Sequence, residues 1–154
     1  MNVPYFNRSY FFDQGILFEC QQCGACCSGA PGTVYVYKSE TEKIACYLSL
    51  HVSSLIDKYL YPLKGDYSVR EYPDGRCSFF QDGCTIYPVR PGQCRTFPFW
   101  FENLRSPEKW RKVSKECPGI GGGRYYPKEQ ILKIIHSAMT AEMVSDETLA
   151  RLEL

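Results

Sequence analysis

The sequence predicts a small, irregular α+β domain of short strands and helices organised around a cysteine metal centre. Three observations lead to this fold class. The 154 residues include nine cysteines, four of them in "FECQQCGACCSG" (Phe18–Gly29). Short aromatic and β-branched runs are bounded by glycine and proline, and other segments carry helix-capping patterns. The length suits one domain with its own core, so we expect a single domain over residues 1–154, with a motif region at 18–118 and a C-terminal helical segment at 125–154.

Short extended segments are expected around the cysteines. "GILFEC" (15–20) is apolar and should deliver Cys20 in extended conformation, and "GTVYVY" (32–37) has strand composition. "CSFF" (77–80) and "CTIY" (84–87) flank a glycine-containing turn and predict a hairpin. That hairpin would bring its two leading cysteines close together.

Helices are predicted where capping signals precede apolar periodicity. Ser39, followed three residues later by Glu42, forms a capping-box pattern at the start of one helix. A shorter helix should run over about 53–61 and end at Pro62. The clearest helix is expected at 127–143, with a proline in its first turn.

Composition and charge exclude several classes of partner. The formal net charge is +1, so no global field favours nucleic acid or an anionic membrane. No run is apolar and long enough to cross a bilayer, and the first residues lack the pattern of a signal peptide. We therefore expect a cytoplasmic protein with no nucleic-acid or membrane partner. The sequence assigns no oligomeric state.

The cysteines indicate metal binding rather than disulfides. A reducing cytoplasm disfavours persistent disulfides. A bridge between the adjacent Cys26 and Cys27 would also strain the peptide that joins them. Eight cysteines are the candidate ligands: Cys20, Cys23, Cys26, Cys27, Cys77, Cys84, Cys94 and Cys117.

The spacing of the first cysteines suits two kinds of centre. The double C-x2-C spacing, with Gly24 after the second thiol, is typical of three ligands of one [4Fe–4S] cluster. The Cys117–Pro118 pair resembles the distant cysteine of bacterial ferredoxins. A single C-x2-C also forms half of a tetrahedral zinc site. The cofactor is thus a 4Fe–4S cluster, slightly favoured, or one or two Zn²⁺ ions.

Two further cysteines refine this prediction. In an extended segment, Cys26 and Cys27 would point to opposite sides, and so toward two centres or two sides of a large one. Cys46 lies among apolar neighbours in the helix predicted from Ser39, so we expect a buried, inert thiol that binds no metal. Without Cys46, eight cysteines remain, enough for two four-thiolate sites.

Nearby arginines are predicted to offset the thiolate charge. Arg90 and Arg95 lie beside the candidate ligands and are expected to support the bound cofactor from the layer behind the thiolates. The alternative is that these arginines are ordinary surface residues. Arg76 is a weaker candidate for the same role, and these arginines could instead pair with Asp74 and Asp82.

These segments resemble a known family. "FECQQCGACCSGAPG" and "GRCSFFQDGCTIYPVRPGQCRTFPFW" are similar to the cysteine-cluster family named after its CxxCxxCC motif, described as a zinc- or iron-chelating domain. The family also resembles part of the flagellin lysine N-methylases, which are linked to an iron–sulfur cluster. The resemblance covers about 18–118 and implies metal binding by seven cysteines, with Cys117 a less securely matched eighth. It implies that Arg90, Pro91 and Arg95 accompany them.

Three functions fit these observations. The first is a metal-binding cysteine-cluster protein whose iron–sulfur cluster serves redox or modification chemistry. The alternative is a zinc-binding structural or chelating module that engages a protein partner. A metal carrier or redox sensor is a third, weaker hypothesis. Whether the protein is an enzyme stays open, and no catalytic residue is assigned.

Overall fold

The computed structural model describes residues 7–27 and 33–144. Contacts divide the chain into two compact units. Unit 1 comprises Met1–Cys23 and Thr96–Thr140, and unit 2 comprises Gly24–Arg95 and Ala141–Leu154. The boundary therefore falls inside the cysteine motif, between Cys23 and Gly24. Within the described part of the chain, no helix is long and apolar enough to cross a membrane.

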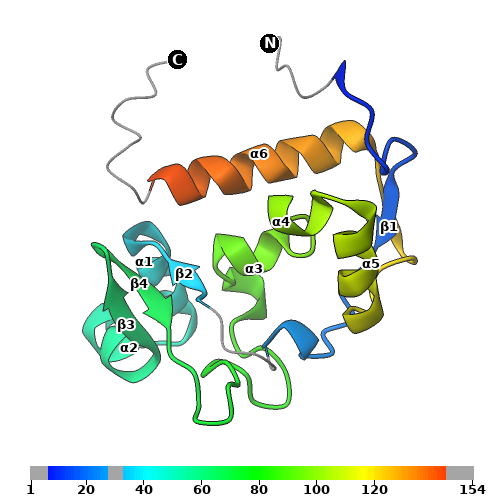
Figure 1. The fold of residues 1–154 in the computed structure, drawn as a ribbon. Helices are drawn as coiled ribbons and strands as arrows, with labels where there is room; N and C mark the ends of the chain where they lie inside the picture. The colour runs from blue at the N-terminus through cyan, green and yellow to red at the C-terminus, as the bar shows by residue number, and fades with distance from the viewer. Residues whose placement is uncertain (1–6, 28–32, 145–154) are drawn as a thin grey trace. The chain divides into compact units, whose positions relative to one another are not determined.

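Unit 1 pairs two short strands beside helices (Figure 1). Strands β1 (Ile16–Phe18) and β5 (Arg124–Tyr126) pair antiparallel. Helices α4 (Phe101–Leu104) and α5 (Pro107–Glu116) follow one another, and α6 (Lys128–Val144) begins just after β5. The core of this unit is aromatic and aliphatic: Phe12, Ile16, Phe18, Phe99, Leu104, Ile131, Leu132 and Ile135.

Helix α5 begins with a side-chain cap and ends at a cysteine. The Ser106 hydroxyl accepts a hydrogen bond from Lys109 N (3.2 Å), and Pro107 occupies the first turn, where its missing N–H costs nothing. At the other end, Cys117 N donates to Val113 O (2.9 Å). The helix thus delivers Cys117 at a fixed point of unit 1.

Unit 2 packs two helices against a three-stranded sheet. The strand order is β2 (Tyr35–Val36), β4 (Asp66–Val69), β3 (Leu60–Leu63), all antiparallel. Figure 1 shows α1 (Lys38–Tyr47) and α2 (Val52–Tyr59) behind this sheet. The buried cluster between them consists of Val36, Ile44, Ala45, Leu55, Leu60, Val69, Phe79 and Ile86.

Three single-turn or short helices carry the rest of unit 2. They are η2 (Ala25–Cys27), η3 (Tyr87–Val89) and α3 (Gly92–Thr96), whose last residue belongs to unit 1. One carboxylate joins α3 to α1. Glu40 accepts hydrogen bonds from Tyr37 N (3.0 Å) at the start of α1 and from Gly92 N (2.8 Å) at the start of α3.

The predicted α+β class of short strands and helices is confirmed, and helix α6 matches the helix expected at 127–143. Residues 145–154 of the predicted C-terminal segment lie outside the described residues. Two local predictions are wrong. Glu40, rather than Glu42, caps α1. The hairpin expected over 77–87 is reduced to isolated bridges between Glu71 and Cys77 and between Phe80 and Cys84.

Candidate metal centre

Five of the six cysteines of unit 2 are predicted ligands, and we call them the five-cysteine set: Cys26, Cys27, Cys77, Cys84 and Cys94. Backbone contacts connect the segments that carry the first four of them. Cys77 N donates to Cys27 O (2.8 Å), and this bond joins η2 to the loop formed by residues 77–84. Phe80 N donates to Cys77 O (2.9 Å), and Phe80 bridges to Cys84. These contacts place η2 and the 77–84 loop against one another.

A glycine makes this close approach possible. Gly24 has φ +79°, a conformation that residues with a Cβ rarely adopt. A Cβ at this position would also collide with the ring of Phe80. Position 24 therefore requires glycine for two reasons: its positive φ turns the chain, and the absence of a side chain leaves room for the Phe80 ring.

Gly24→Ala is expected to destabilise unit 2 and weaken metal retention. Gly65→Ala is the matched control, because Gly65 has φ +84° but no atom within 4 Å of the position that a Cβ would occupy. The control should cost only the left-handed strain, about 1–2 kcal/mol. Gly24→Ala should cost a further ~1–3 kcal/mol from overpacking against Phe80. Urea unfolding of both variants measures the difference. Equal losses would show that the Phe80 contact contributes nothing.

Cys26 and Cys27 form a close thiol pair. Their Sγ atoms lie 4.0 Å apart. The prediction that they point to opposite sides is wrong, because Ala25–Cys27 is a 3-10 turn rather than an extended segment. The two thiols share a hydrogen bond, so the first ionisation is easier and the second harder. The pKa of Cys26 is lowered to about 6, and the pKa of Cys27 is raised.

Burial raises the pKa values of two other thiols of the set, Cys77 and Cys94, and so favours their neutral forms. Burial raises the pKa of Cys94 to about 12, with smaller contributions from the thiolates of Cys77 and Cys26. Burial also raises the pKa of Cys77, and the charges of Cys84 and Glu71 add to the effect. The thiols are near enough to repel one another as anions, which a bound cation would relieve.

Metal binding is therefore expected to release protons and to weaken as the pH falls. Thiols with raised pKa values hold their protons at pH 7, so an ion must displace them, and a lower pH increases the competition. Cys94→Ser should release fewer protons than the unaltered chain, because Cys94 carries one of the raised pKa values. Addition of Zn²⁺ in weakly buffered solution with a pH indicator measures the release. An affinity independent of pH between 6 and 8 would contradict the assignment.

The two predicted arginines have different partners. The Arg90 guanidinium stacks on Tyr87 (3.8 Å to the ring centroid), and its Nε donates to Tyr87 O (3.0 Å). Its charge makes a small contribution to the lowered pKa of Cys26 and partly opposes the rise in the pKa of Cys94. Arg95 instead forms an ion pair with Glu40 (3.7 Å). Arg76 pairs with Asp74 at the surface (2.7 Å), as the alternative for this residue predicts.

Arg90→Gln is expected to weaken metal retention by roughly 10–100-fold, the usual loss for a residue that supports ligands. Arg95→Gln is the matched control, since it removes the same charge from a residue paired with Glu40. It should change retention by less than Arg90→Gln does. Competition with a chromophoric chelator gives both values. If both variants match the unaltered chain, neither arginine supports the thiolates.

Three predicted ligands lie in unit 1. Cys20 and Cys117 are partly buried and pack against its core, and Cys23 is exposed. Cys46 is also exposed, which corrects the expected burial: Ile44 and Ala45 face the core of unit 2, and position 46 turns away from it. Its thiol lies on the outer side of α1, which still gives it no place in the five-cysteine set.

The donor atoms suit the metals that the spacing predicts. Thiolates are the ligands of iron–sulfur clusters and of many zinc sites. In the part of the chain that the structure describes, no three Cys, His, Asp or Glu side chains stand close enough together to hold an ion as they are. The chemistry of the donor set therefore fits zinc or iron, and binding requires cysteine side chains to turn toward one centre.

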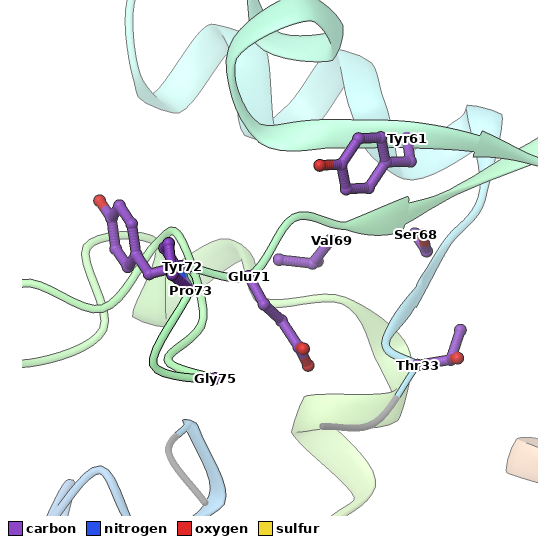
Figure 2. Close-up of a pocket in the computed structure, with 8 residues that line it drawn as sticks. All are labelled: Thr33, Tyr61, Ser68, Val69, Glu71, Tyr72, Pro73 and Gly75. Atoms are coloured by element: carbon purple, nitrogen blue, oxygen red, sulfur yellow. The ribbon is translucent and has the colours of Figure 1, made fainter. Parts of the chain in front are cut away.

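A hollow of about 390 Å³ lies on unit 2 (Figure 2). Glu71 connects it to the cysteines, because Glu71 bridges to Cys77. Figure 2 shows the Glu71 carboxylate between the turn at Gly75 and Thr33. Sequence reasoning did not predict this feature, since its walls come from segments far apart in the chain. They are Thr33, Tyr61, Ser68, Val69, Glu71, Tyr72, Pro73 and Gly75.

Comparison with known proteins locates the cysteines within a described domain. The model of the CxxCxxCC family, described as a "putative zinc- or iron-chelating domain", matches residues 19–118 and so includes all eight predicted ligands. An uncharacterized protein of Methanocaldococcus jannaschii is 31% identical over 99 residues, which are 60% of this chain and 52% of the relative. The chain thus spans about half the length of this curated relative. No solved structure matches the chain.

Proposed function

This chain belongs to the CxxCxxCC family, a family of metal-chelating domains, and from that premise we propose that its cysteines hold an iron–sulfur cluster. Chelation of zinc or iron is the general function of the family. The choice of an iron–sulfur cluster is the specific proposal. Such a cluster, when bound, supplies one-electron transfer, for redox chemistry or for the modification of another molecule.

The five-cysteine set carries this proposal. A single tetrahedral ion needs four ligands, and the set offers five thiols, two of them with sulfurs 4.0 Å apart. A [4Fe–4S] cluster also takes four thiolates, one on each iron. Because its irons lie apart, those thiolates can come from separate segments, as Cys27, Cys77 and Cys94 do.

The surroundings of the set support a charged, shielded cofactor. Four thiolates around an oxidised [4Fe–4S] core leave a charge of about −2 by simple addition, and hydrogen bonds and charge near the sulfurs tune such a centre. Arg90 provides a positive charge that acts on Cys26 and Cys94. Phe79 is only 1% exposed beside the loop, and the ring of Phe80 covers Gly24. These residues would limit access of water and oxygen.

A zinc-binding structural module that engages a protein partner is the second candidate. The turn at Cys20 favours it, because Gln22 N donates to Cys20 Sγ (3.4 Å) within a C-x2-C segment. A C-x2-C segment of this kind supplies half of a tetrahedral zinc site. Either cofactor needs reduced thiols, so the cytoplasm is the proposed location.

Anaerobic preparation followed by metal and sulfide analysis separates the two candidates. The iron–sulfur proposal expects iron and labile sulfide in equal amounts, with broad visible absorption that bleaches in air. Zinc without colour or sulfide would overturn it in favour of the zinc module. Cys46→Ser is the control, since its exposed thiol should leave the metal content unchanged. A chain that retains neither metal would contradict both candidates.

A further inference from the structure

We infer that Cys20, Cys23 and Cys117 form a thiolate metal site of their own in unit 1, distinct from the five-cysteine set of unit 2. The inference deepens the proposed function, since it rests on metal binding by the cysteines and divides them between two centres. Its expected ligand is a single soft divalent cation such as Zn²⁺.

Backbone pairing in unit 1 brings two of these cysteines to the same place. Beyond β1, Glu19 N donates to Gly119 O (3.0 Å), and Phe18 bridges to Ile120. Cys20 directly follows Glu19, and Cys117 lies two residues before Gly119. Antiparallel pairing at this point therefore holds the two cysteine-bearing segments side by side.

Two glycines allow the 117–123 loop to lie close against the segment that carries Cys20. A Cβ at Gly119 would collide with the carbonyl oxygen of Glu19, and a Cβ at Gly123 would collide with the Glu19 side chain. Gly123 also has φ +78°. The loop can approach this closely only because both residues lack side chains, so the position of Cys117 relative to Cys20 is fixed by the fold.

The turn from Cys20 to Cys23 has the features of a thiolate ligand. Gln22 N donates to Cys20 Sγ (3.4 Å), and Gln22 itself has φ +51°. Residues with a Cβ rarely adopt that left-handed conformation. Strain of this kind persists where the surrounding structure or a function requires it. Here it aims a backbone N–H at a sulfur, a hydrogen bond of the kind that orients metal-binding side chains.

Cys117 is placed where a cation is favoured. It caps the C-terminal end of α5, with Cys117 N bonded to Val113 O (2.9 Å). The carbonyl groups at a helix C-terminus carry partial negative charge, which disfavours a bare thiolate and favours a bound cation. Cys20 and Cys117 are partly buried against the core, while Cys23 is exposed and can turn toward them without repacking.

The resulting site differs in kind from the five-cysteine set. Three thiolates leave one position of a tetrahedral ion for an exogenous ligand such as water. The backbone contacts described for the five-cysteine set all lie within unit 2, and those of Cys20 and Cys117 all lie within unit 1. The eight predicted ligands thus divide into three and five, rather than into four and four.

Metal stoichiometry tests this division. The full chain, stripped of metal and reconstituted anaerobically with Zn²⁺, is gel-filtered and analysed for zinc per chain. Cys117→Ser and Cys20→Ser should each lose one ion and keep the zinc of the five-cysteine set. Cys94→Ser should keep the unit 1 ion, and Cys46→Ser should match the unaltered chain. In Cys94→Ser, Co²⁺ should still give thiolate-to-cobalt absorption.

Two results would overturn the inference. If Cys117→Ser and Cys20→Ser keep all their zinc, unit 1 holds no site. If Cys117→Ser and Cys94→Ser each empty the chain while their circular dichroism stays that of the unaltered protein, the cysteines form one joint centre. Should Cys117→Ser fail to fold, Cys20→Ser gives the answer, because its side chain lies outside α5. If the protein as purified contains zinc and no iron, the iron–sulfur proposal is wrong, but the division of the cysteines between two sites is unaffected.

Discussion

Cys94→Ser is expected to abolish metal retention by the five-cysteine set. Cys94 lies in α3, at a position where burial raises its pKa to about 12. A bound cation compensates a buried thiolate, whereas the shorter serine hydroxyl is a poor ligand for zinc or iron. The loss should exceed the ~100-fold that removal of a supporting residue causes.

Cys46→Ser is the control for that experiment. It makes the same chemical change in the same unit, at an exposed thiol. Its free energy of unfolding should stay within about 0.5 kcal/mol of the unaltered value, as is usual for surface substitutions. Metal analysis after dialysis against a chelator compares the two variants. If Cys94→Ser retains as much metal as Cys46→Ser, Cys94 is a core thiol and not a ligand.

Chelation of the metal is expected to unfold unit 2. Its sheet is short, with β2 only two residues long, and the 77–94 segment contains turns and single-turn helices. Some of the contacts that order this segment run through the cysteines, as in the bond from Cys77 N to Cys27 O, while Phe79 and Ile86 pack in the core. Unit 2 has little regular structure, so metal ligation would add constraints that hold its segments together. Removal of the ion would therefore lower the free energy of unfolding of unit 2.

Two spectroscopic signals can follow this unfolding. The chain has two tryptophans, Trp100 and Trp110, and both belong to unit 1. Far-ultraviolet circular dichroism reports on both units, while tryptophan fluorescence reports on unit 1. A strong chelator should reduce the helical signal and lower the melting temperature. An unchanged spectrum and melting curve after complete metal removal would show that the hydrophobic core folds without metal.

Elements with strong local signals could be predicted from the sequence. Helix α6 follows a proline and carries apolar residues at helical spacing, and β1 and β2 coincide with apolar or β-branched runs. The β3–β4 hairpin was missed because the helix predicted over about 53–61 was extended to Pro62, whereas α2 ends at Tyr59 and Leu60–Leu63 is strand β3. The turn between these strands consists of Lys64 and Gly65. Both have positive φ, the geometry of a tight two-residue hairpin turn, and the glycine is the part of this turn visible in the sequence.

The sequence predicted which residues are candidate ligands, but it predicted less well where their side chains lie. Helical periodicity could have placed Cys46 away from the face that carries Ile44, whereas its apolar neighbours suggested burial. The pairing of Arg95 with Glu40 could not be read locally, because it depends on how α3 docks on α1. Likewise, the pairing that joins Glu19 to Gly119 spans most of unit 1.

The Glu40 carboxylate has a consequence for the order in which the protein matures. The carboxylate accepts a hydrogen bond from Gly92 N, 52 residues further along the chain. This bond fixes the start of α3, the helix that carries Cys94. During synthesis Cys26 and Cys27 emerge first, and this anchor can form only after residue 92 has left the ribosome. Closing so long a loop is entropically costly until the segments between have packed. The five-cysteine set is therefore expected to take up its metal after translation of the motif region is complete, and the early thiols must stay reduced until then.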